Sequence, residues 1–481
     1  MKKGREYLFS DAPVFEAILQ LALPTIIGQI ILIIYNMADT FFIGLTGSDA
    51  MLTAVTVCMP AFMFLSAISN LFGIGGGAVI SRALGKNNRN RAVNASAYAL
   101  YGCILAAVLY GAGVLLLKDG YVNILGGSQP LVHMYAAEYL TVTVIIGGVF
   151  TAVSTLLSHL IRSEGRSMKA SFGIAMGGIL NIILDPLFMF LILPKGREAL
   201  GAAIATALSN VISCIYFILV IYRLQKEKST VLSFRFAHDA LIDGSAKEIL
   251  LNGLPACLMT LFENVSYAVL DHLMAFGGME AQAGLGVAKK VNMLAHCMVR
   301  GMSQGVLPLI AFNYSAGNYR RMKDTIRVSA GMSVLLSLVT LVLCFTFSRQ
   351  LIGIFIRSES MSLAYGTRFL RILCLGCPFS AFAYAIISFF QAVGKSGRSF
   401  VLAVCRKGAL DIPMMFVLFR SLSVRGVVWA TPITDIICCT AAFMLYRNAL
   451  KNMKISLWNK DLNSEIRADD TILLQRNAKH A

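Results

Sequence analysis

Residues 85–89 read Gly-Lys-Asn-Asn-Arg, and residues 317–321 read Gly-Asn-Tyr-Arg-Arg. Each of these polar turns follows a long apolar run, and the same order of apolar runs and polar breaks surrounds both turns. The two halves of the chain therefore repeat each other as two copies of one structural unit. Further pairs that support the repeat are Leu23-Pro24 with Leu254-Pro255, Gly165-Arg166-Ser167 with Gly397-Arg398-Ser399 and, more loosely, residues 201–206 with 426–431.

The composition places this repeat in a membrane. Of the 481 residues, 57% are apolar and only 14% are charged, and the mean hydropathy is +0.71. Soluble domains are about 45–50% apolar and about 25% charged, so a soluble chain of this composition would expose too much hydrocarbon to water. The composition excludes a soluble enzyme, a DNA-binding protein and a secreted disulfide scaffold. We expect no nucleic-acid partner, although the net charge is +17.

Apolar runs of about 20 residues, the length that crosses a bilayer, recur along both halves. Six runs in each half mean that both halves enter the membrane with the same orientation. We predict an all-α polytopic membrane protein with twelve transmembrane helices in two pseudo-symmetric six-helix bundles. The expected spans are 14–44, 51–80, 93–117, 133–161, 169–193, 200–222, 249–276, 282–313, 325–347, 364–393, 400–420 and 426–446.

The repeat also predicts the domain organisation. Residues 1–222 form the N-terminal bundle, 223–248 a polar linker, 249–446 the C-terminal bundle and 447–481 a tail with too little apolar surface to fold alone. Parallel repeats of this kind are typical of transporters, in which the substrate site lies near the membrane midplane between the two halves.

The basic residues predict the orientation, because Lys and Arg collect in cytoplasmic loops. With the N-terminus in the cytoplasm, about 30 of the 42 basic residues lie inside, at Lys2, Lys3 and Arg5, in the linker, in the tail and in four clusters. We therefore predict that both termini are cytoplasmic. The clusters are Arg82/Lys86/Arg89/Arg91, Arg162/Arg166/Lys169, Arg320/Arg321/Lys323/Arg327 and Lys395/Arg398/Arg406/Lys407, whereas Arg349, Arg357, Arg368 and Arg371 fall on the outer side.

Acidic residues inside an apolar span are functional candidates, because a charge at the bilayer centre costs several kcal/mol. Asp185 lies about halfway along the fifth span, and Asn181 lies four residues earlier on the same helix face. Pro186 lacks an N–H group and disturbs the helix beside this carboxylate. Such a group can hold a proton or a small hard cation; the alternative is a structural hydrogen bond between helices.

Three further acids lie in or near the spans. Asp39 would reach the outer interface on a straight helix from Val14, about 37 Å along, unless a kink at Pro24 or a longer span draws it back. Glu263 lies near the middle of the seventh span, where the first half has Leu32. Asp271 lies close to the position that corresponds to Asp39, but nearer the helix end, so it is either a site residue or a boundary residue.

A basic stripe runs along the eighth span. Lys289, His296 and Arg300 are spaced by seven and four residues, which places them on one helix face beside Lys290. The stripe either neutralises Glu263 or Asp271, attracts an anionic substrate, or consists of boundary side chains that extend to the membrane surface. The pair Cys374-x-x-Cys377 has a redox spacing but lies in an apolar run, so we interpret both cysteines as structural.

The chain resembles the multidrug and toxic compound extrusion (MATE) family of secondary transporters, in its DinF and MepA branch, from Pro13 to about Tyr446. The resemblance rests on several motifs that are specific only together. They are the Leu-Pro openings of spans one and seven, Asp39 before Phe42-Ile43-Gly44, Ser81-Arg82-Ala83-Leu84-Gly85, Leu160-Ile161-Arg162-Ser163-Glu164-Gly165, Asn181-x-x-Leu184-Asp185-Pro186 and the run from Val306 through Pro308 to Asn313-Tyr314.

This resemblance implies two bundles around a central cleft that export organic cations or other amphipathic drugs in exchange for H⁺ or Na⁺, without a cofactor. It makes Asp39, Asn181 and Asp185 the coupling site, with Tyr35 and Thr206 as neighbours. If Na⁺ is the coupling ion, Asp39 and Asp185 would bind it. Glu263 matches an acidic position of the NorM-type branch, which leaves open whether coupling lies in the N-terminal or the C-terminal bundle. The expected protein is a monomer in a bacterial cytoplasmic membrane.

A proton cycle follows from these residues. Burial in an apolar bundle disfavours a charged carboxyl, so Asp39 or Asp185 would take up a proton outside and release it inside. The change in buried charge would then favour one conformation over the other. The rival hypothesis is a flippase for lipid-linked precursors, in which Lys289, His296 and Arg300 would hold a pyrophosphate. An intramembrane enzyme is not supported, because no nucleophile with a base and no H-E-x-x-H pattern is present.

Overall fold

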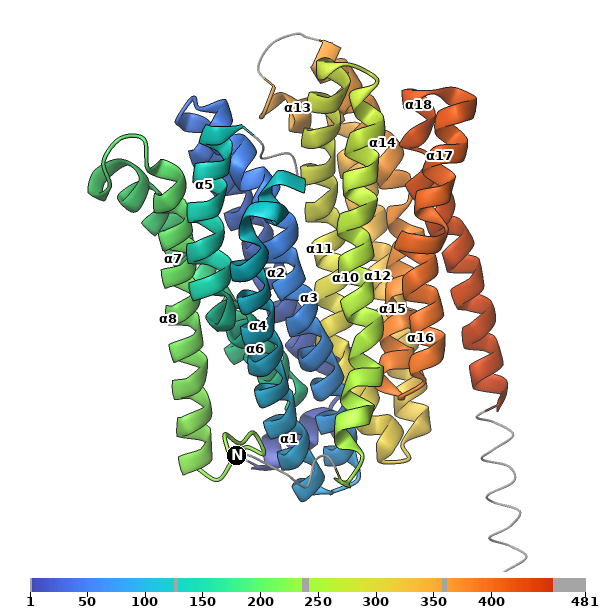
Figure 1. The fold of residues 1–481 in the computed structure, drawn as a ribbon. Coiled ribbons are helices and arrows are strands. Elements are labelled where there is room, and N and C mark those ends of the chain that lie inside the picture. Colours follow the sequence, from blue (N-terminus) through green and yellow to red (C-terminus); the bar gives the residue numbers. More distant parts are fainter. Residues whose placement is uncertain (1, 125–128, 236–241, 357–360, 453–481) are drawn as a thin grey trace, which may run out of the picture.

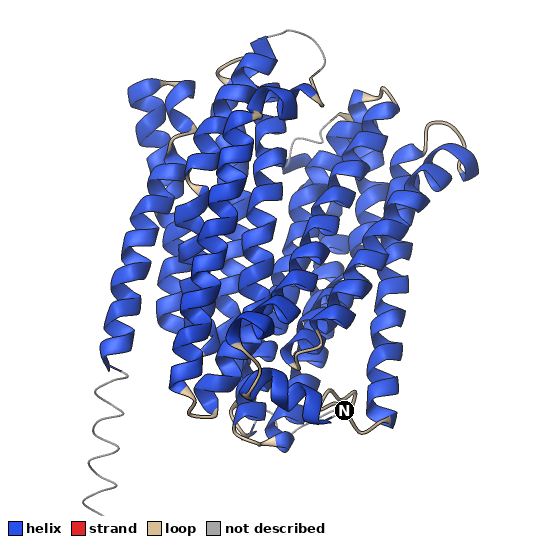
Figure 2. Cartoon of the chain, turned by 180° about the vertical axis from the view of Figure 1, so that it is seen from behind, coloured by secondary structure: helices blue, strands red, loops and turns tan. Residues whose placement is uncertain are grey.

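The computed structural model describes residues 2–124, 129–235, 242–356 and 361–452, and this part of the chain is helical without any β-strand (Figures 1 and 2). The first half contains α1 (Lys2–Ser10), α2 (Val14–Leu45), α3 (Asp49–Gly85), α4 (Arg89–Ile124), α5 (Pro130–Leu140) with the π-helix η1 (Thr141–Ile146), α6 (Gly148–Ser163), α7 (Ser167–Pro186) with η2 (Leu187–Ile192), and α8 (Glu198–Lys226). The second half contains α10 (Ser245–Ala275), α11 (Met279–Ser315), α12 (Tyr319–Thr346), α13 (Ser348–Gly353), α14 (Met361–Leu375), α15 (Cys377–Ala392), α16 (Ser396–Val404) with η3 (Cys405–Ala409), α17 (Asp411–Leu422), α18 (Val424–Val427) and a final helix over 430–452.

Within the described ranges, eight helices are long and apolar enough to cross a membrane, and ten spans result when each of two bent pairs counts as one. The bent pairs are 130–163, with a bend of 48°, and 361–392, with a bend of 42°. The two other predicted spans coincide with α11 and with α16, η3 and α17, which are the helices that carry several charged side chains. The all-α polytopic fold predicted from the sequence is confirmed.

Some predicted boundaries differ from the observed ones. The helix α8 continues to Lys226 and α10 begins at Ser245, so both ends of the predicted linker 223–248 are helical. The predicted tail begins within the final helix, which extends through residue 452, and residues 453–481 lie outside the described part of the chain. Helices extend beyond the apolar runs because their backbone bonds form equally well in the more polar membrane interface.

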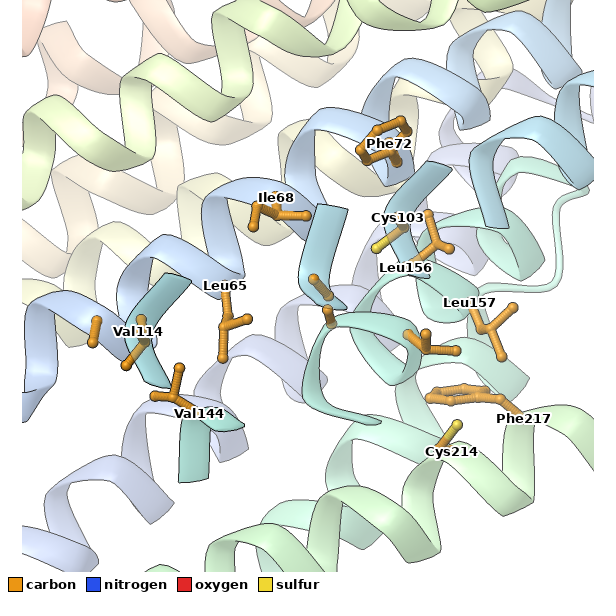
Figure 3. Packing of buried hydrophobic residues seen from close by; sticks show 14 of the residues in the cluster. Leu65, Ile68, Phe72, Cys103, Val114, Val144, Leu156, Leu157, Cys214 and Phe217 are labelled. Atoms are coloured by element: carbon orange, nitrogen blue, oxygen red, sulfur yellow. The ribbon is translucent and has the colours of Figure 1, made fainter. Parts of the chain in front are cut away.

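The helices form two groups, α2–α8 and α10–α18, that meet at the end of the molecule where the N-terminus lies (Figure 1). The first group has its own apolar core, which includes Leu65 and Phe72 of α3, Leu156 of α6 and Phe217 of α8 (Figure 3). A second cluster joins the groups, because it combines α1 and α2 with α11 and α15. Within this cluster Phe9 of α1 stacks on Phe312 of α11 with the ring centroids 5.0 Å apart.

Glycines allow the two halves to approach closely along this seam. A Cβ atom on Gly253 of α10 would lie 1.7 Å from the carbonyl oxygen of Leu71 of α3, and one on Gly75 would lie 2.2 Å from the carbonyl oxygen of Ile249. On the other side of the seam, a Cβ on Gly305 of α11 would lie 2.6 Å from the Cα of Ala22 in α2. In a membrane, where helix association depends on close packing, small residues of this kind hold helices together.

A polar cluster lies at the same seam. Arg82 of α3 donates to Glu248 of α10 at 2.7 Å and to the backbone carbonyls of Gln391 and Ala392, at 3.1 and 2.9 Å, at the end of α15. Arg91 of α4 also binds Glu248, at 2.6 Å. Arg82 was expected among the cytoplasmic loop cations, but it is buried because its guanidinium connects the two halves.

Candidate functional site

A cavity of about 320 Å³ lies between the two halves. Its lining comes from α2, α3, α6, α7 and α8 on one side and from α10, α11 and α15 on the other. The wall mixes apolar, aromatic and polar side chains, and a hydrogen bond of 2.9 Å from Asn70 to Thr260 crosses between the halves. A cavity of this size and lining suits an amphipathic small molecule.

The predicted acidic site of the first half is assembled from three helices. Asn181 and Asp185 of α7 and Thr206 of α8 are all buried. The Asn181 amide nitrogen lies 3.4 Å from Asp185 Oδ1 and 3.3 Å from Thr206 Oγ1, so it donates to both. Asp39 of α2 joins this group, because its carboxyl lies close enough to the Asp185 carboxyl for the two to interact electrostatically.

This group has spare acceptor capacity. Asp39 Oδ1, Asn181 Oδ1 and Asp185 Oδ2 are buried and have no hydrogen-bond partner among the described residues. Two neighbouring carboxyl groups cannot both stay charged without compensation, so one proton or one cation between them is needed to balance the site. The oxygen donors present are of the type that binds H⁺ or Na⁺.

Local sequence explains how the acids come together. Gly178 has no side chain, and a Cβ there would lie 2.9 Å from the Tyr35 ring, so α2 packs directly on α7. After Asp185, Pro186 removes a backbone donor and the helix continues as the π-helix η2, a feature often found at functional sites. Tyr35 lines the cavity, whereas Asp39, Asn181, Asp185 and Thr206 lie behind the cavity wall.

The predicted site residues of the second half are paired with one another. Arg300 binds both oxygens of Glu263, at 3.0 and 2.8 Å, and both side chains line the cavity. Lys289 forms an ion pair with Asp271, whose side chain is 44% exposed, as expected of a residue at a helix end. The acids are therefore neutralised by the basic residues of α11.

The basic stripe does not form one site. His296 is buried and contacts Ser380 Oγ at 3.4 Å, and neither His296 nor Lys289 lines the cavity. Lys290, which lies next to Lys289, does line it, together with Arg300. Lys289 and His296 of α11 thus contact neighbouring helices, whereas Lys290 and Arg300 line the cavity.

Arg406 and Lys407 correct an expectation from the sequence. They were assigned to a cytoplasmic cluster, but both are buried in η3, and only 1% of the Arg406 side chain is exposed. Arg406 binds Asp435 at 2.8 Å, and Lys407 binds Asp411 at 3.3 Å. Asp411 also accepts hydrogen bonds from Ser266 and Thr431, at 2.6 and 3.2 Å. The spacing of Lys407 and Asp411, four residues apart inside a predicted span, was the signal for this pair.

The cysteine pair has a structural environment. Cys374 and Cys377 are free and buried, and their sulfurs lie 3.7 and 3.5 Å from the Asn292 side-chain oxygen. Across the described ranges, no group of three or more His, Cys, Asp and Glu side chains is arranged to hold a metal ion.

Comparisons with known proteins agree with this geometry. A family model described as MatE matches residues 24–187 and 255–417. Multidrug export protein MepA of Staphylococcus saprophyticus subsp. saprophyticus is 29% identical over 449 residues, which cover 92% of this chain and 96% of that protein. MepA of Staphylococcus haemolyticus is 28% identical over 460 residues, which cover 95% and 99%. The fold is similar to the outward-facing conformation of a multidrug resistance MATE family transporter of the MOP superfamily, with a TM-score of 0.85, 22% identity and coverage of 94% and 99%.

Proposed function

The chain belongs to the MatE family of multidrug and toxic compound extrusion transporters, and on this premise we propose that it exports amphipathic drugs, including organic cations, in exchange for H⁺ or Na⁺. It is a transporter and not an enzyme. The observation that carries the proposal is the cavity, which is lined by both halves and lies beside a buried carboxyl site with spare oxygens. A substrate bound there would be released when the halves move relative to each other.

Coupling would run through α2. One part of this helix carries Asp39 and Tyr35, and the part near Ala22 packs on Gly305 of the other half. Asp39 and Ala22 are separated by about 25 Å along a helix that rises ~1.5 Å per residue. An ion that binds between Asp39 and Asp185 removes charge repulsion between α2 and α7 and so changes how α2 meets α11.

The first half is the better location for this coupling. Glu263 is already neutralised by Arg300, whereas the Asp39 and Asp185 carboxyls have no basic partner among the described contacts. A proton that enters down 100 mV supplies ~2.3 kcal/mol, and each pH unit adds ~1.4 kcal/mol. Together, one proton and one pH unit supply ~3.7 kcal/mol, which corresponds to a gradient of a neutral substrate of several hundredfold at most.

The proposed setting is a bacterial cytoplasmic membrane. With both termini cytoplasmic, the seam at Arg82 lies on the inner side and the cavity faces the outside. Each chain contains a complete cavity, so we propose that the monomer is the working unit. The flippase alternative is less well supported, because Lys289 and Arg300, two of the three residues predicted to hold the pyrophosphate, are paired with acids.

The test is transport by purified protein in liposomes, with a pH gradient and a Na⁺ gradient imposed separately. Asp185→Asn is expected to abolish ion-driven efflux of a cationic dye, whereas Asp119→Asn, which changes an exposed acid, is expected to leave efflux unchanged. The gradient that drives efflux in the wild type identifies the coupling ion. Efflux at the wild-type rate in Asp185→Asn would refute the assignment of Asp185 to ion coupling. If Arg300→Gln loses transport while Asp185→Asn retains it, the flippase would be favoured.

A further inference from the structure

Arg162 is a buried cation that faces the central cavity. It lies in the last turn of α6, is only 3% exposed and lines the cavity. One guanidinium nitrogen contacts His159 Nδ1 at 3.2 Å, and Nε has no hydrogen-bond partner among the described residues. No ion pair involves Arg162 within the described ranges. A guanidinium stays charged in proteins, so this position carries an uncompensated charge that an anion would stabilise.

A second donor without a partner faces the same cavity. Gln391 of α15 is 4% exposed and lines the cavity, and its side-chain nitrogen has no partner in the described part of the chain. Gln391 is the counterpart of His159 in the internal repeat, since both precede the glycine of the repeated Gly-Arg-Ser motif by six residues. The matching positions of the two halves, His159 and Gln391, therefore both line the cavity.

Contacts with α3 show that the two donors lie at a similar depth. Ser81 donates to the carbonyl of Ser163, next to Arg162, at 2.8 Å, and Arg82 donates to the carbonyl of Gln391 at 3.1 Å. Side chains on a helix lean toward its N-terminus, and α6 and α15 both end at the seam. The Arg162 and Gln391 side chains are thereby directed from the seam into the cavity.

We propose that this closed end of the cavity binds the carboxylate of an amphipathic substrate, with Arg162 as the charge partner and Gln391 as a second donor. A guanidinium and an amide offer donors in the planar arrangement that suits a carboxylate. One cation with a neutral neighbour matches a single negative charge, and a pyrophosphate would need more cations. The inference rests on the proposed function and extends its substrates to zwitterionic and anionic drugs.

This site differs from the basic stripe predicted from the sequence. Lys289 and Arg300 are each held by an acid, whereas Arg162 belongs to the other half and has no acid beside it. The residue was assigned to a cytoplasmic cluster because it ends an apolar run, and sequence position alone does not give the direction of its side chain.

The test uses two dyes that differ only in whether their carboxylate is free or esterified. Rhodamine B carries a free carboxylate, and in its ethyl ester this carboxylate is masked. Binding of both dyes to the purified full-length protein is measured by fluorescence anisotropy. Arg162→Gln is expected to weaken binding of rhodamine B at least about tenfold and to change binding of the ester less than about threefold, because only the charge-assisted bond is lost. The control Lys169→Gln removes an exposed cation from the start of α7 and should change neither affinity.

Two more variants keep the inference falsifiable if Arg162→Gln is poorly folded. Arg162→Lys keeps the charge and should bind rhodamine B within about threefold of the wild-type affinity. Gln391→Met keeps the side-chain length and should weaken binding of rhodamine B more than binding of its ethyl ester. Equal loss of binding of both dyes, or no loss of either, in Gln391→Met would overturn the proposal, as would a loss of more than about tenfold in rhodamine B affinity in Arg162→Lys. Ion-driven efflux of the ester tests the proposed function separately, since it does not depend on the carboxylate.

Discussion

The Arg82 guanidinium and the Glu248 carboxylate belong to different halves and form an ion pair of 2.7 Å at the seam. The same guanidinium binds two carbonyl groups at the C-terminal end of α15, where the helix dipole favours a positive charge. Because glycine contacts surround this pair, the halves cannot separate at this end without breaking it. Arg82 therefore stabilises the conformation in which this end of the cavity is closed.

Replacement of Arg82 by Gln should shift the protein toward the conformation that opens at the seam. The loss of hydrogen bonds from a charged donor costs ~1.5–3 kcal/mol for each, so the ratio of the two states should change at least about tenfold. Hydrogen–deuterium exchange at the end of α15 measures this shift and should increase. The control Arg89→Gln removes a cation that binds Thr230 within the linker, and it should leave exchange in α15 unchanged.

The variant Gly253→Ala should prevent closure of the seam. A Cβ atom at this position meets the Leu71 carbonyl oxygen at 1.7 Å, a distance that only a backbone shift can relieve. We expect the protein to insert and fold, since alanine favours helices by about 1 kcal/mol over glycine, but to lose transport. Gly331→Ala is the matched control, because a Cβ there meets nothing within 4 Å. Normal efflux by Gly253→Ala would show that the close contact is dispensable.

The buried pair of Lys407 and Asp411 makes a prediction about stability. Asp411→Asn leaves Lys407 charged without its partner and should destabilise the protein by ~3–5 kcal/mol. The double variant Lys407→Met with Asp411→Leu removes both charges and should recover most of this loss. Thermal unfolding in detergent of Lys407→Met, Asp411→Leu and the double variant gives the coupling between the residues. A double variant that is stable but inactive would instead assign the pair a role in transport.

Glu164 connects the linker to the first half. Its carboxylate is buried and accepts hydrogen bonds from Thr230 Oγ1 at 2.8 Å and from the Val231 backbone N–H at 2.7 Å. Glu164→Ala should release the linker and raise amide exchange in residues 229–233 at least about tenfold, because bonds to a charged acceptor are lost. Glu198→Ala, which removes a half-buried carboxylate at the start of α8 that accepts from the Gly196 N–H, should not affect these residues. Unchanged exchange in Glu164→Ala would mean that other contacts hold the linker.

The sequence predicted the membrane fold and the acidic group of the first half for clear physical reasons. The length of an apolar run must match the thickness of the bilayer. Asn181 and Asp185 lie on the same helix face however that helix packs against its neighbours. The addition of Asp39 to this group depends on how α2 packs against Gly178, which spacing along one chain does not reveal. The same limit applies to Lys289 and Arg300, because their partners lie on a neighbouring helix.

The charged residues of the final spans were harder to predict. Arg406 and Lys407 follow an apolar run, as a loop cluster does, and only the acids on adjacent helices make their burial tolerable. Arg162 resembled a loop cation for the same reason. A hydropathy profile records how polar a segment is, but the direction of each side chain depends on tertiary packing.

The internal repeat has a consequence for how the two copies have diverged. The first copy has the carboxyls of Asp39 and Asp185 without a basic partner among the described contacts, while the second pairs Glu263, Asp411 and Asp435 with Arg300, Lys407 and Arg406. An ion pair that is already neutral gains little from another proton, so under the proposed coupling the second copy would not respond to the ion. Duplication would then leave the response to the ion to one copy, while the other copy keeps its charges paired.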